Sequence, residues 1–142
     1  TSKLIELINK CPQNWQWLYR FHPSTDASMV SDIQTAFKGN INIEFEESTK
    51  LPLPCLLEEI DFCITRYSAA AFACFDYQTP VVFVDKGALL YFEDFIDDRK
   101  NHFVESTEEI AEILKTNEIT SRLQEIQNKG QNLVKEVEKV IT

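Results

Sequence analysis

The chain has 142 residues, of which 44% are hydrophobic and 26% are charged. These values are near globular averages and argue against a disordered chain, and the length suits one domain with its own core better than two. The net charge of −9 argues against nucleic acid as a partner, because non-specific affinity for nucleic acid comes from clustered Lys and Arg.

No apolar run approaches the roughly 18 residues of a membrane-spanning helix, so we expect no integral membrane segment. The four cysteines lack a CxxC pair or metal-ligand spacing, which favours free thiols in a reduced, cytoplasmic compartment and no metal site. The N-terminal residues lack an initiating Met and the pattern of a signal peptide. We therefore expect a single domain over 1–142 that is a fragment of a longer chain.

The first half of the chain predicts helix, strand, helix and strand in turn. Apolar residues at helical spacing predict a helix over 3–10, and the aromatic run 15–21 predicts a strand. A helix follows the capping residues 24–26 and stops at Gly39, and alternation over 41–45 predicts an edge strand. We expect the buried face of this helix to consist of Met29, Val30, Ile33, Ala36 and Phe37.

The second half contains a βαβ unit, with apolar strands over 62–64 and 81–84 and a crossover helix between them. A short helix through Leu56 and Leu57 precedes it, since the prolines at 52 and 54 exclude a strand there. Downstream, the pattern predicts a helix over 88–95, a strand over 102–104, a helix opened by the capping box 106–109, and further helix over 118–141.

Strands that alternate with helices along the whole chain predict an α/β fold. We expect a three-layer α/β/α Rossmann-like domain with a mainly parallel sheet and the C-terminal helices packed outside.

His22 and Arg20 are candidates for holding a phosphate. His22 follows a predicted strand and precedes Pro23, and Arg20 lies two residues earlier on the same face of that strand. Guanidinium and imidazole groups both donate hydrogen bonds to anions. The alternative is that His22 only caps the next helix.

Ser68 lies where a predicted strand meets a helix, which is where open α/β sheets bind ligands and where free N–H groups favour an anion. It could equally be a simple N-cap. Ala69 and its small neighbours would let a ligand approach the backbone. Tyr67 could stack on a base or only pack. Asp85 could accept hydrogen bonds from sugar hydroxyls or cap the helix after Gly87.

No GxSxG, P-loop or GxGxxG motif is present. The segments Arg20-Phe-His-Pro23, Asp61 to Thr65, Tyr67 to Phe72 and Thr79 to Asp85 together resemble the C-terminal, nucleotide-binding half of GT-B glycosyltransferases. The resemblance is strongest to bacterial capsule enzymes, His-Pro sialyltransferases and CDP-glycerol glycerophosphotransferases. It implies a nucleotide-sugar donor (UDP-, CMP- or CDP-linked), no other cofactor, and phosphate contacts from His22 and Ser68.

The chain departs from this family in two respects. Ala69 and Ala73 stand where members often have a second hydroxyl and an acidic residue. The family also has a central strand before the first helix and an N-terminal acceptor domain, both expected to be absent here, so the isolated domain should be inactive. Exposed strand edges would then favour a homodimer.

Three functions follow from these patterns. The first is the donor-binding half of a glycosyltransferase or glycerophosphotransferase that builds a bacterial surface polysaccharide, peripheral at the inner membrane, with His22 as the catalytic residue. The second is a non-catalytic protein-interaction module, which Ala73 favours. The third is half of a sugar-nucleotide epimerase.

Overall fold

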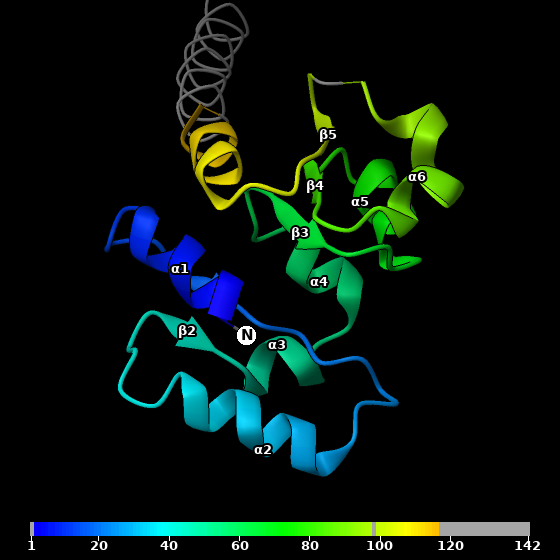
Figure 1. Cartoon of the computed structure of the whole chain (residues 1–142). Coiled ribbons are helices and arrows are strands. Elements are labelled where there is room, and N and C mark those ends of the chain that lie inside the picture. Colours follow the sequence, from blue (N-terminus) through cyan, green and yellow to red (C-terminus); the bar gives the residue numbers. More distant parts are fainter. Residues whose placement is uncertain (1, 98, 117–142) are drawn as a thin grey trace, which may run out of the picture.

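The computed structural model describes residues 2–97 and 99–116, and the helix expected over 118–141 lies outside these ranges. Within them, short strands alternate with helices and pair into two parallel sheets. Figure 1 shows the sheets one above the other, and β3 is the strand of the upper sheet nearest the lower one. The expectation of an α/β fold with parallel strands is therefore confirmed.

The lower sheet has two strands, β1 (Trp17–Leu18) and β2 (Ile43–Glu44), which pair in parallel. Helix α1 (Ser2–Lys10) precedes β1, and α2 (Ala27–Ala36) connects the two strands. The predicted helix stop is confirmed, because α2 ends at Ala36 and Gly39 adopts a φ of 94°, a conformation that glycine accepts without steric cost.

The predicted buried face of α2 is wrong at two positions. Met29 is 54% exposed and Ala36 is also exposed, whereas Phe37, just after the helix, is buried. A sheet of only two short strands offers α2 too little apolar surface to cover a full helical stripe.

The upper sheet has the order β3-β4-β5 and contains the predicted βαβ unit. β3 (Cys63–Thr65) pairs in parallel with β4 (Val81–Phe83), and α5 (Ala70–Asp76) connects them. β5 (Asn101–Phe103) pairs in parallel with β4 on its other side. The central strand β4 is completely buried, as its continuous apolar sequence predicts.

Three further helices connect these elements. α3 (Glu46–Lys50) and α4 (Leu53–Leu57) lead from β2 to β3, and α6 (Gly87–Phe92) follows β4. A 3-10 turn over Glu93–Phe95 continues α6. The sequence predicted α4 and the helix after β4 but not α3.

One hydrophobic cluster lies on each face of the upper sheet, because alternate residues of a strand point to opposite faces. Val82 belongs to a cluster with Leu7 of α1 and Leu114, while Val81 and Phe83 belong to a second cluster with α5 and α6. Both faces of β4 are therefore covered.

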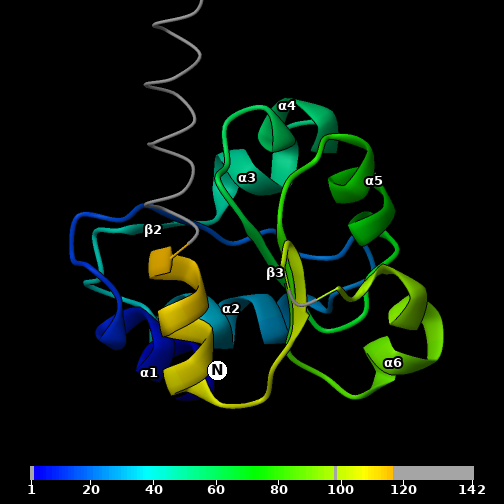
Figure 2. The ribbon, with the colours of Figure 1, turned by 90° about the horizontal axis from the view of Figure 1, so that it is seen from above.

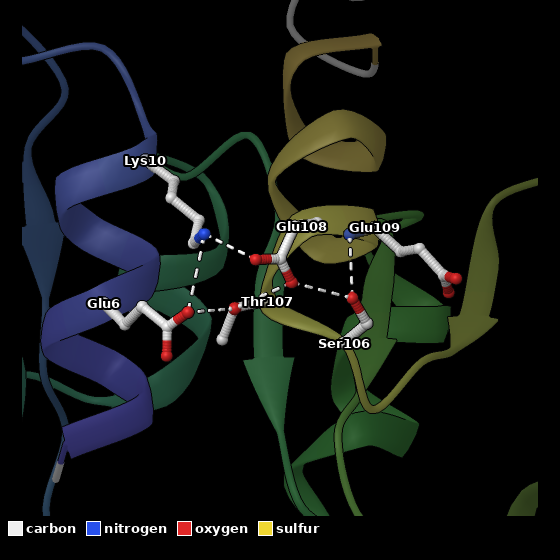
Figure 3. A network of polar contacts seen from close by, with 6 residues as sticks. All are labelled: Glu6, Lys10, Ser106, Thr107, Glu108 and Glu109. Carbon is white, nitrogen blue, oxygen red and sulfur yellow. Dashed lines mark hydrogen bonds and ion pairs between the residues drawn. The ribbon is translucent and has the colours of Figure 1, made fainter.

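Residues 107–116 form a helix that begins where the capping box predicted. The Ser106 hydroxyl accepts the Glu109 backbone N–H at 3.5 Å, as an N-cap does. Figure 3 shows how this helix is joined to α1 by polar side chains. Lys10 Nζ lies 2.5 Å from a Glu108 carboxylate oxygen, and Thr107 donates a 2.9 Å hydrogen bond to Glu6.

Candidate functional site

His22 lies in the exposed segment between β1 and α2. Its Nδ1 accepts the Ser24 backbone N–H at 3.2 Å and lies 2.7 Å from the Ser24 hydroxyl oxygen. Nε2 therefore carries the hydrogen of the neutral imidazole, and it has no hydrogen-bond partner within residues 2–97 and 99–116. The contacts with Ser24 hold the imidazole ring in place. Nε2 can therefore donate a hydrogen bond to an anion.

Ser68 is exposed in the segment between β3 and α5. Its hydroxyl oxygen accepts the Ala70 backbone N–H at 3.2 Å, so it does stabilise the start of α5. Its own backbone N–H donates to the Thr65 hydroxyl at 3.4 Å. The hydroxyl hydrogen of Ser68 remains available as a donor, so the structural role and a ligand-binding role are compatible.

Arg20 has a structural role that its sequence position did not indicate. One guanidinium nitrogen, Nη1, donates to the backbone carbonyl oxygens of Ser48 and Leu51, both at 2.6 Å. These carbonyls lie at the C-terminal end of α3, where carbonyl groups lack partners within the helix. The guanidinium therefore fastens α3 to the end of β1.

Asp85 is also occupied by the fold. One carboxylate oxygen accepts the Gly87 backbone N–H at 2.8 Å, and the other accepts two hydrogen bonds from Arg66, at 2.7 and 3.0 Å. The Gly87 N–H and then the Arg66 guanidinium lower the pKa of Asp85 below its usual value. Of the two roles considered for Asp85, capping the helix that begins at Gly87 is the one present in this structure.

Arg66 was missed by the sequence analysis. It follows β3 directly, and its guanidinium carbon lies 5.5 Å from the centre of the Tyr67 ring. The Tyr67 side chain is 45% exposed, and an added Cβ at Gly87 would lie 2.8 Å from its ring. Tyr67 thus lies against the start of α6 and near the Arg66 guanidinium, and nearly half of its surface is exposed. The sequence did contain a signal for this pair, because Arg66 and Asp85 follow two strands that were predicted to be parallel neighbours.

The alanines that depart from the family pattern differ in their surroundings. Ala69 is exposed beside Ser68, whereas Ala73 is half-buried on α5 against the second hydrophobic cluster. An acidic side chain at 73 would have to leave that cluster to meet a ligand.

His22 and Ser68 come from different sheets and form no hydrogen bond with each other. The segments that follow β1 and β3 nevertheless run to the same side of the molecule, the right-hand side in both Figures 1 and 2. The structure thus brings two loops to one side of the molecule, and it uses Arg20 and Asp85 to hold the fold.

Within residues 2–97 and 99–116, no three His, Cys, Asp or Glu side chains are grouped as a metal ion would require. None of the helices in these ranges combines the length and apolar character needed to cross a bilayer. All four cysteines are free thiols.

The comparisons with known proteins give no assignment. No model of a known protein family matches the chain, and neither a curated protein nor a solved structure matches it.

Proposed function

We propose that this chain is the donor-nucleotide-binding half of a GT-B-like glycosyltransferase or glycerophosphotransferase of bacterial surface-polysaccharide synthesis. The observation that carries the proposal is the pair of exposed donors, His22 Nε2 and the Ser68 hydroxyl, each in the segment that follows a parallel strand. The carboxyl ends of parallel strands are where α/β proteins bind nucleotides. We include in this proposal that the domain has a Rossmann-like fold.

In this mechanism, the imidazole and the hydroxyl donate hydrogen bonds to the phosphate of the departing nucleotide. Their contribution is electrostatic, because negative charge develops on that phosphate as the bond to the transferred group breaks. The base that activates the acceptor would come from a separate N-terminal domain, so this half alone should bind nucleotide without turnover.

Binding is tested by titrating the chain with UDP, CMP and CDP while recording amide NMR spectra. We expect at least one nucleotide to shift amides in the segments around His22 and Ser68. His22→Ala and Ser68→Ala should each weaken binding by about tenfold to a hundredfold, since a hydrogen bond to a charged group contributes roughly 1.5–3 kcal/mol. His102→Gln and Ser28→Ala are matched controls, because His102 is a half-buried residue of β5 and Ser28 is exposed on α2.

A second function has support from a different surface. Leu90 and Tyr91 on α6 are 82% and 66% exposed, and Leu89 and Phe95 nearby are also exposed. Contiguous exposed apolar residues are typical of protein-interaction sites. If none of the three nucleotides binds, a non-catalytic interaction module becomes the better proposal.

A further inference from the structure

The outward positions of α6 are all apolar. Ala88 and Phe92, one turn apart, form the buried side of this helix. Leu89, Leu90 and Tyr91 lie between them and are 39%, 82% and 66% exposed. A helix that covers a sheet normally has polar residues on its outer side, because that side contacts water. The apolar residues at these positions are therefore not needed by the core.

Helix α1, on the other face of the upper sheet, has the usual pattern. Figures 1 and 2 both show α1 and α6 on opposite sides of the molecule. The exposed positions of α1 are all polar, and they are Ser2, Lys3, Glu6 and Asn9. The apolar outer side thus distinguishes α6 from the helix that covers the same sheet on its other face.

Two aromatic rings extend this apolar surface beyond α6. Phe95 of the 3-10 turn and Phe72 of α5 are both exposed, and their rings meet edge to face with centroids 5.7 Å apart. The Phe72 ring also contacts Phe92 of α6 at 5.1 Å, and Phe95 stacks on Phe75 at 4.5 Å, so both rings are held in place. Aromatic residues are enriched in the cores of protein interfaces. We call the exposed apolar residues together the α6 face: Leu89, Leu90, Tyr91, Phe95 and Phe72.

The charged residues beside the α6 face are acidic. Glu93 and Asp94 follow α6 directly, and both are exposed. Neither carboxylate has an ion-pair partner among residues 2–97 and 99–116. Their charges are therefore available to a cation from outside the described part of the chain.

The chain supplies few cations of its own here. The sequence has no Lys or Arg over 67–85 or over 87–98. Arg66 and Lys86, at the borders of these ranges, are each paired with a carboxylate, at 2.7 and 3.9 Å. Arg99 and Lys100 belong to the bend that leads into β5. The α6 face thus combines exposed apolar area with negative charge.

This combination decides among the possible occupants. A second copy packed on the same face across a two-fold axis would place like carboxylates opposite each other, which is unfavourable. An anionic bilayer surface would be repelled by the same carboxylates. A protein segment with an apolar stripe bordered by Lys or Arg is complementary to both the apolar area and the charge.

We propose that the α6 face docks a cationic amphipathic segment of another protein. Apolar side chains of that segment would pack on Leu90, Tyr91 and Phe95, and its Lys or Arg side chains would pair with Glu93 and Asp94. The inference uses none of the residues proposed to hold a nucleotide, so it is independent of nucleotide binding.

The probe is a synthetic helical peptide of Leu and Lys, about 14 residues long, with the leucines along one side. It is titrated into the whole chain, without nucleotide, while NMR spectra are recorded. We expect saturable shifts over residues 89–95. A peptide with Glu in place of Lys should bind at least about tenfold more weakly, and affinity for the Lys peptide should fall as salt is added.

The apolar contribution is tested with Leu90→Ala combined with Tyr91→Ala. This variant should weaken binding of the Lys peptide by at least about tenfold, because it removes apolar area that is buried only in the complex. Met29→Ala is the matched control, since Met29 is 54% exposed on α2. It should leave the affinity unchanged.

The charge contribution is tested with Glu93→Gln combined with Asp94→Asn. This variant should weaken binding about fivefold at low salt and should reduce the salt dependence of the affinity. Asp26→Asn combined with Asp32→Asn changes the net charge by the same amount at exposed positions at the start of α2 and within it. That control should leave the affinity and its salt dependence almost unchanged.

Several results would overturn the proposal. The Lys peptide could fail to bind, could bind no better than the Glu peptide, or could be as sensitive to the α2 variants as to the α6 variants. Nuclear Overhauser contacts from Leu90 and Tyr91 to residues 117–142 in the free chain would show that the chain covers its own α6 face. Shifts at this face that grow with chain concentration, together with dimer formation in sedimentation, would make a second copy the occupant.

Discussion

At the scale of single residues, several of the polar side chains proposed as ligand contacts form hydrogen bonds with backbone groups of the fold. Arg20 and Asp85, which sequence position suggested as ligand contacts, bind carbonyl and amide groups of the fold. For Arg20 the sequence contained no sign of this role, because the carbonyls that it binds belong to residues 28 and 31 positions away. For Asp85 the bond to Gly87 is local, and it was one of the two roles predicted. His22 and Ser68 bond mainly to near neighbours, and therefore their exposed placement after a strand could be predicted.

The ion pair of Glu108 and Lys10 makes stability depend on pH. Lys10, as the largest influence, lowers the Glu108 pKa to about 2, from an ordinary value of 4.5. A lowered folded-state pKa stabilises the fold above the unfolded pKa, and this contribution disappears as the pH falls toward 2. We expect Glu108→Gln to have a lower urea midpoint than the original chain at pH 6. The difference between the two midpoints should become smaller as the pH falls below about 4.5.

The matched control is Glu112→Gln, because Glu112 is exposed on the same helix and forms no ion pair among the described residues. Its urea midpoint should follow that of the original chain across the pH range. A difference for Glu108→Gln that stays constant from pH 6 to pH 2 would contradict the prediction.

At the scale of elements, local patterns predicted the type of element better than its length. The strand expected over 15–21 pairs only at Trp17–Leu18, because β2 is equally short and no other strand of the described residues pairs with β1. Both strands and the connecting helix of the βαβ unit were predicted, each strand to within one residue at its ends, since all three lie within one stretch of sequence. Helix α3 was missed because it is five residues long and has only one buried residue, Ser48.

The junction between the segment after β3 and the start of α6 can be probed at Gly87. A Cβ there would lie 2.8 Å from the Tyr67 ring, closer than van der Waals contact allows. Because the ring is half-exposed and can turn, we expect Gly87→Ala to cost only about 1 kcal/mol in urea unfolding, at the low end for overpacking.

The double variant supplies the control. In a Tyr67→Ala background, Gly87→Ala should cost much less, since the obstructing ring is gone. Equal costs in both backgrounds would show that the two residues are not coupled.

At the scale of the whole molecule, the C-terminal part of the described chain completes the core. Leu114 is completely buried in the cluster that also contains Leu7 and Val82, so the first and last described helices depend on each other. This long-range packing brings α1 and the 107–116 helix together over the upper sheet, as the polar network in Figure 3 also indicates.

Leu114→Ala should therefore lower the free energy of unfolding by about 3 kcal/mol, within the range for buried leucine truncations. The matched control is Leu90→Ala, since Leu90 is 82% exposed on α6 and should change stability by less than about 0.5 kcal/mol. Both are measured by urea unfolding followed by circular dichroism. Similar losses for the two variants would contradict the placement of the 107–116 helix in the core.

The sequence alone determined that the chain is an α/β protein with a βαβ unit around Ser68, because hydrophobic periodicity and capping residues act over a few positions. Only the tertiary structure decided that the strands divide into two sheets, that Arg20 binds the carbonyls of α3, and that Arg66 pairs with Asp85. Strand pairing and long-range hydrogen bonds depend on which distant segments meet, and neither periodicity nor capping carries that information.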